Sequence, residues 1–101
     1  NENYWGKNKI KFVLEVRKPI KNSEYCLIGS CDELGSWDIN RAVSMRTIGK
    51  NLFEAEAELP IGKIFDCKCL AKLDNKSIWM DGDNIIETVN KKAGQKVSLK
   101  W

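Results

Sequence analysis

The chain has 101 residues, of which 43% are hydrophobic and 31% charged, as expected for one globular domain with a buried core. No apolar run approaches the ~20 residues that span a bilayer, so we expect no membrane partner. The net charge of +3 arises mostly from scattered lysines, whereas nucleic-acid-binding domains usually concentrate basic charge on one face. Histidine is absent, which excludes His-ligated zinc and Ser-His or Cys-His catalysis but leaves carboxylate catalysis open.

The N-terminal half of the chain alternates between short apolar runs and turn residues. Residues 1–8 are polar and are expected to form a linker or N-terminal arm, with the folded domain covering residues 9–101. Apolar and polar side chains alternate over residues 10–17, which predicts a half-buried strand. Turn residues delimit the next elements, which are a strand at 25–28, a loop at 31–41 and a strand at 42–45.

Residues 52–59 have the composition of a helix but the periodicity of a strand. Their Glu, Ala and Leu content favours a helix. Apolar residues nevertheless alternate strictly with Glu54, Glu56 and Glu58, and the segment is short for a helix. We therefore predict a strand with the glutamates on a solvated face, where a cation site is the alternative interpretation.

The C-terminal half contains further strand signals and no convincing helix. The expected strands lie at 64–73, 77–80, 85–89 and 96–101. Turn signals recur roughly every ten residues, a spacing typical of an all-β sandwich or barrel.

The four cysteines are interpreted as buried thiols that act as small hydrophobic side chains. Cys26 and Cys31 are five positions apart and Cys67 and Cys69 two apart, and these spacings fit neither common zinc pattern. A disulfide and a four-cysteine zinc site are the alternatives. Free thiols favour a reducing compartment such as the cytoplasm, and we expect neither a metal nor a cofactor.

Two loops carry tryptophan where a polar residue is usual. Trp37 lies in a Gly-Ser-Trp turn, and Trp79 precedes a tight polar turn that ends at Asn84. With Lys68 nearby, these residues suit a flat ligand that has apolar faces and hydroxylated edges. A sugar fits that description. The alternative is that each indole covers one end of the core.

Five motifs stand in the order and spacing of a known family. They are Cys26-Leu27-Ile28-Gly29-Ser30, Leu34-Gly35-Ser36-Trp37-Asp38, Leu59-Pro60-Ile61-Gly62, Phe65-Asp66-Cys67-Lys68-Cys69 and Trp79-Met80-Asp81-Gly82-Asp83-Asn84. From about Ile10 to Trp101, the chain resembles the family 20 starch-binding modules (family 20 carbohydrate-binding modules). The resemblance implies an all-β fold, an immunoglobulin-like antiparallel β-sandwich of about seven to eight strands.

The resemblance also implies a principal sugar site made of Trp37, Lys68, Trp79 and Asn84. Sugar rings pack their C–H faces on indoles, and two rings at an angle match the curve of an α-1,4-glucan helix better than flat cellulose. Lys68 would donate to sugar hydroxyls, and Asn84 can both donate and accept hydrogen bonds.

The chain departs from the family at both sugar sites. Met80 replaces a usual glutamate and Ile85 a usual arginine, so Asp81 or Asp83 is the candidate replacement acceptor. A second site of these modules relies on tyrosines, and one of those positions is Cys26 here. Tyr25 points to the other face and Phe53 replaces a frequent tryptophan. We therefore expect the second site to be absent or much weakened.

These observations predict a non-catalytic module that binds α-1,4-glucan (starch, glycogen or maltooligosaccharide) and targets a covalently attached domain to the polysaccharide. Such a module raises effective concentration without chemistry of its own. Two other functions remain open. One is a degenerate module that serves as a regulatory or protein-docking domain, and the other is a nucleic-acid-binding β-barrel that uses the same lysines and rings.

Overall fold

The computed structural model describes residues 6–101, so Tyr4 and Trp5 of the expected arm lie outside the described residues. Nine strands and two short 3₁₀ helices occur in that range. The strands are β1 Lys7–Glu15, β2 Glu24–Gly29, β3 Val43–Ser44, β4 Arg46–Gly49, β5 Leu52–Pro60, β6 Ile64–Leu73, β7 Lys76–Trp79, β8 Ile85–Thr88 and β9 Lys96–Lys100. The helices η1 Asp32–Leu34 and η2 Ile39–Arg41 lie between β2 and β3.

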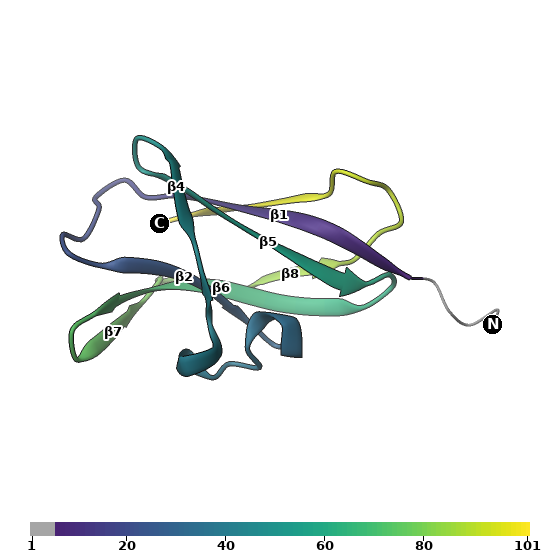
Figure 1. Cartoon of the computed structure of the whole chain (residues 1–101), viewed down its shortest axis with the longest axis horizontal. Helices are drawn as coiled ribbons and strands as arrows, with labels where there is room; N and C mark the ends of the chain where they lie inside the picture. Colours follow the sequence, from purple (N-terminus) through teal and green to yellow (C-terminus); the bar gives the residue numbers. More distant parts are fainter. Residues whose placement is uncertain (1–5) are drawn as a thin grey trace.

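The strands form two sheets that face each other as a sandwich (Figure 1). The first sheet has the order β4-β5-β1-β9, and the second has the order β3-β2-β6-β7. β7 pairs with the C-terminal part of β6, and β8 pairs with the N-terminal part of β6. The fold class expected from the sequence is therefore confirmed. No helix in residues 6–101 has the length and apolar character needed to cross a membrane.

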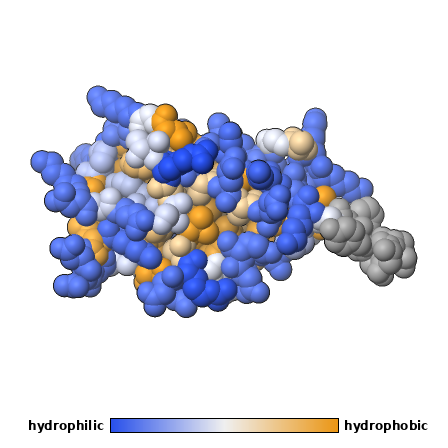
Figure 2. Space-filling view, in the orientation of Figure 1, coloured by the Kyte–Doolittle hydropathy of each residue, from blue (hydrophilic) through white to orange (hydrophobic). Residues whose placement is uncertain are grey.

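The segment at 52–59 is a strand, as its period of two predicted. β5 pairs antiparallel with β1, so that Lys11 lies opposite Glu56 and Lys9 opposite Glu58. Alternate residues of β1 are buried, and charged residues cover the outer face of this sheet. Figure 2 shows that hydrophilic residues occupy most of the visible surface, and that apolar residues show in the middle of this face and at scattered places along its edges.

Two features of the sheets differ from expectation. β9 pairs with β1 in parallel, because the chain crosses from the second sheet after β8 and enters the first sheet in the direction of β1. The expected first strand also begins earlier, at Lys7, so that Asn8 lies inside β1 and is buried.

The predicted strand at 42–45 is wrong in its extent, since the chain changes sheets there. β3 belongs to the second sheet and β4 to the first, and only Met45 separates them. Met45 is buried, and its N–H donates to the carbonyl of Tyr25 at 2.9 Å. Figure 1 shows the ribbon crossing from one layer to the other in the segment that ends in β4.

The second sheet is buried on both faces over part of its length. The main core lies between the sheets, and its largest fully buried side chains include Phe12, Phe65, Ile10, Leu14 and Leu27. A smaller cluster of Cys26, Ile28 and Leu70 packs on the other face, under Ile39 and Ala42 of the η2 region. The connection that contains Trp37 is thereby anchored on the outer face of the second sheet.

Candidate functional site

Trp37 lies on a backbone loop of unusual conformation between η1 and η2. Gly35, Ser36 and Trp37 all have positive φ, at 89°, 49° and 63°, a region that residues with a side chain rarely adopt. An added Cβ at Gly35 would lie 2.6 Å from the carbonyl oxygen of Arg41. The Trp37 N–H donates to the carbonyl of Gly29 at 2.9 Å, which ties the loop to the end of β2.

Trp79 is held on the outer face of the second sheet by the pairing of β7. It lies opposite Leu70 of β6, and successive residues of a strand point to opposite faces. Met80 is buried, and its N–H donates to the carbonyl of Cys69 at 3.0 Å. Where the resemblance leads us to expect glutamate, the chain therefore has a core methionine that anchors the end of β7.

The two indoles meet, although they are distant in sequence. Their ring centroids are 6.4 Å apart and their planes are inclined by 41°. Trp37 is 36% exposed and Trp79 38% exposed, so each ring is partly anchored and partly open to solvent. We call this pair the aromatic cradle. Its exposed ring surface can pack against the C–H faces of a sugar.

Lys68 and Asn84 lie on the same outer face and hold the loop that follows Trp79. The Nζ of Lys68 donates to the carbonyl of Gly82 at 2.5 Å, and the Nδ2 of Asn84 donates to Asp66 Oδ2 at 3.0 Å. The side-chain oxygen of Asn84 (Oδ1) accepts no hydrogen bond from residues 6–101. Ammonium and amide groups both have further hydrogen-bonding capacity, so the two residues combine a structural role with capacity for a ligand.

Sequence reasoning missed the supporting role of Asp66. It lies two residues before Lys68 on the same face of β6, and it accepts the Asn84 hydrogen bond. The period of two along β6 is the signal that places Asp66 and Lys68 together. The hydrogen-bond partners of Asp66 and Lys68, which are Asn84 and Gly82, could not be deduced from the sequence, because residues 80–84 carry no regular pattern.

Asp81 is exposed and lies beside the cradle rather than within the Lys68–Asn84 group. It lines a groove of about 270 Å³ together with Trp79. We call this the side groove, and its other lining residues are Arg17, Lys18, Ile20, Ile78 and Trp101. Asp83 is exposed as well and does not line this groove.

Packed side chains occupy the positions at which the resemblance implies a second sugar site. Cys26 is buried beneath the η2 region. Phe53 packs on Tyr25 with ring centroids 4.5 Å apart, and the Tyr25 hydroxyl accepts the N–H of Ile20 at 2.8 Å. Both rings belong to the main core, and the loss of the second site remains a prediction.

The glutamates of β5 face cations of the protein itself. Glu54 is bonded by Arg46 and lies 3.4 Å from the Nζ of Lys11. Burial tends to raise the pKa of Glu54, but hydrogen bonds from Arg46 and Lys11 outweigh it and the pKa is lowered. In residues 6–101, no three Cys, Asp or Glu side chains gather as a metal site.

All four cysteines are buried free thiols, as interpreted from the sequence. Burial is the main cause that raises the pKa of each, to about 12 for Cys67. The raised pKa keeps the thiols protonated, whereas thiolates are the reactive form. These four side chains therefore act as packing groups.

Comparison with known proteins identifies the family. The profile described as "Starch binding domain" matches residues 7–98. The chain belongs to the starch-binding domain family. It is a non-catalytic binding module, and the resemblance inferred from the five motifs is confirmed.

Relatives of this starch-binding domain include parts of much larger proteins. Glucoamylase-1 of Arthroderma benhamiae is 29% identical over 98 residues, which are 93% of this chain but only 16% of that protein. A family 15 glucoamylase structure from Hypocrea jecorina gives a TM-score of 0.86 at 17% identity, over 95% of this chain and 17% of that one.

A stand-alone domain structure is also similar. The family 20 carbohydrate-binding module of a maltotetraose-forming amylase from Pseudomonas saccharophila gives a TM-score of 0.78 at 18% identity. The match covers 92% of this chain and 99% of that one. At such identity the likeness shows a common fold.

Proposed function

We propose that this starch-binding domain holds α-1,4-glucan on the aromatic cradle, with Lys68, Asn84 and Asp81 as hydrogen-bonding partners. The carrying observation is the inclined pair of partly exposed indoles, whose ring centroids lie 6.4 Å apart. Their backbones are fixed by independent hydrogen bonds to β2 and β6, so little ordering is required on binding. The names of the relatives, a glucoamylase and a maltotetraose-forming amylase, are consistent with an α-glucan ligand.

We further propose that the domain targets an attached domain to the polysaccharide. The chain spans only 16% of the curated glucoamylase that it matches, which supports a role as one module of a longer protein. Binding through a single shallow site gives modest affinity, yet it raises the effective concentration of whatever is linked to it.

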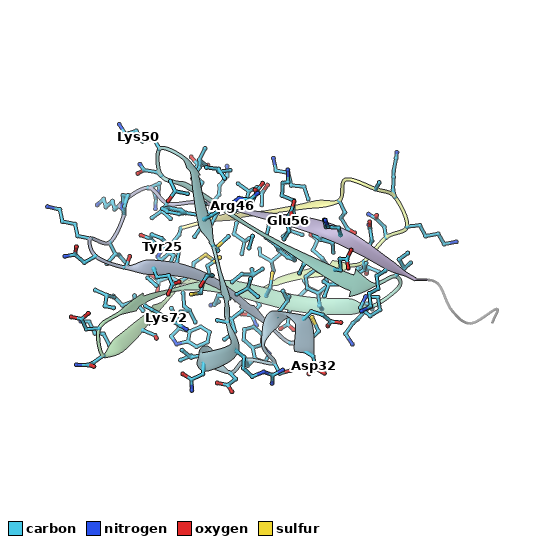
Figure 3. The ribbon with its side chains drawn as sticks, viewed as in Figure 1. Tyr25, Asp32, Arg46, Lys50, Glu56 and Lys72 are labelled. Carbon is cyan, nitrogen blue, oxygen red and sulfur yellow. The ribbon has the colours of Figure 1, made fainter. Side chains whose placement is uncertain are left out.

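The cradle is tested by Trp37→Ala and Trp79→Ala. Burying one ring is worth roughly 1.5 kcal/mol or more, so each variant is expected to lose at least about tenfold in affinity for amylose. Retention in amylose-containing gels measures this, with circular dichroism to confirm folding. Lys50→Ala is the matched control, because Lys50 lies at the tip of the β4–β5 turn, far from Asp32 and η1 (Figure 3). Folded variants of both tryptophans with parental retention would refute the cradle.

The competing functions give different results in the same assay. Glucan binding is expected to persist at high salt and to be competed by β-cyclodextrin. Nucleic-acid binding weakens steeply as salt rises. A degenerate docking domain, for which the replacement of glutamate by buried Met80 is the supporting observation, would show no retention even in the parent.

A further inference from the structure

We propose that the side groove extends the glucan site and takes the sugar units that follow those held on the cradle. The inference rests on the proposed function and adds residues that lie outside the principal site. Trp79 belongs to both places, since it pairs with Trp37 and also lines the groove. A polymer that covers the cradle must leave it on one side, and the groove begins at Trp79.

The groove has the chemistry that a sugar ring requires. Ile20, Ile78 and Trp101 supply apolar surface, and Arg17 and Asp81 supply donors and acceptors at the rim. Neither Arg17 nor Lys18 forms an ion pair within residues 6–101, so their donors are available to hydroxyl groups. With a volume of about 270 Å³, the groove suits a sugar unit rather than a folded partner.

The wall that carries Trp101 is already fixed. The Trp101 N–H donates to the carbonyl of Glu15, and the Arg17 N–H donates to the carbonyl of Trp101, both at 2.8 Å. The indole packs edge-on against Tyr25, with centroids 5.6 Å apart. A preformed wall lowers the entropic cost of binding.

The groove and the cradle lie on two sides of one edge strand. β7 ends the second sheet on this side, and Trp79 and Ile78 point to opposite faces of it. A ligand that reaches both must bend around the end of β7. The curved α-1,4-glucan chain can do so, whereas a straight chain would leave the groove empty.

The experiment compares maltotriose, short enough for the cradle alone, with maltoheptaose. We expect Arg17→Ala to weaken maltoheptaose binding about fivefold relative to maltotriose binding, as for one lost hydrogen bond. Lys50→Ala is the control for loss of a surface cation. Calorimetric titration measures the affinities, and the indole N–H signal of Trp101 in ¹H–¹⁵N spectra is expected to shift with maltoheptaose only.

The outcomes separate the two proposals. If the parent binds neither sugar, the proposed function is wrong and the extension falls with it. If the parent binds both while Trp101 does not respond and Arg17→Ala changes neither affinity, the side groove is not a subsite and the cradle stands.

Discussion

At the scale of single residues, the site depends on a backbone conformation that few residues tolerate. Gly35, Ser36 and Trp37 have consecutive positive φ angles. Such strain persists only where the surroundings impose it. Here the imposing contacts are the hydrogen bond from Trp37 to β2 and the close approach of the Arg41 carbonyl to Gly35. Glycine at position 35 is therefore a requirement of the aromatic cradle as well as of the fold.

Gly35→Ala is expected to destabilise the domain by about 2–5 kcal/mol, through the strained φ and the clash with the Arg41 carbonyl. Glucan retention should fall as well, because Trp37 is displaced. Gly62→Ala is the control, since Gly62 has the same sign of φ, at 91°, but nothing within 4 Å of an added Cβ. It should cost only about 1–2 kcal/mol and leave retention intact. Denaturant unfolding of both variants provides the measurement, and equal costs would contradict this account.

At the scale of elements, strands β4, β5 and β1 are joined through the Glu54 carboxylate. The Glu54 side chain is 7% exposed, and it pairs with Arg46 of β4 (Figure 3) and with Lys11 of β1. Burial opposes ionisation, yet the two cations lower the pKa of Glu54 below 4.5. An unpaired charge at this depth would be costly.

The lowered pKa sets the sign of a pH dependence. A carboxyl whose folded pKa is depressed stabilises the fold above its unfolded pKa, and loses that contribution as pH falls through the folded value. Stability should thus decline as pH falls below about 4.5. Glu54→Gln should flatten that decline in denaturant titrations at successive pH values, while Glu58→Gln, on the exposed face, should not. If stability declined with falling pH in the same way in Glu54→Gln and in the parent, Glu54 would make no such contribution.

At the scale of the whole molecule, the four thiols report on the integrity of the core. Cys67 and Cys69 lie in the main core between the sheets, and Cys26 lies in the small cluster under η2. Burial raises the pKa of each, so the thiolate that reacts with labelling reagents is scarce in the folded state. Access to Cys67 and Cys69 requires that the sandwich open, and access to Cys26 requires that the η2 region move away from the second sheet.

We therefore expect the folded protein to resist thiol labelling at pH 8, and all four cysteines to react in denaturant. Labelling of Cys67 and Cys69 should require unfolding of the sandwich, and Gly35→Ala should accelerate it about tenfold for each ~1.4 kcal/mol of stability that it removes. Mass spectrometry of the labelled chain measures the four sites separately. Rapid modification of Cys67 in the parent under native conditions would contradict the packing described here.

The sequence by itself determined the sandwich, the strand at 52–59 and the buried state of the cysteines. The reason is local, because side chains alternate along a strand with a period of two whatever the strand pairs with. The same pattern placed Asp66 and Lys68 on one face. Together with the five motifs, it was sufficient to predict the family and the residues of the cradle.

Only the tertiary structure decided the features that join distant segments. The parallel pairing of β1 with β9 and the change of sheet at Met45 depend on where the chain crosses the sandwich. The 41° inclination of Trp37 to Trp79 depends on how the loop of Trp37, which has no regular period, lies against the end of β7. The side groove likewise joins segments that are distant in sequence, and its walls are Arg17, Lys18, Ile20, Ile78, Trp79, Asp81 and Trp101. Local periodicity carries no information about such contacts, because they are set by where the chain crosses between the sheets and how its loops fold back on them.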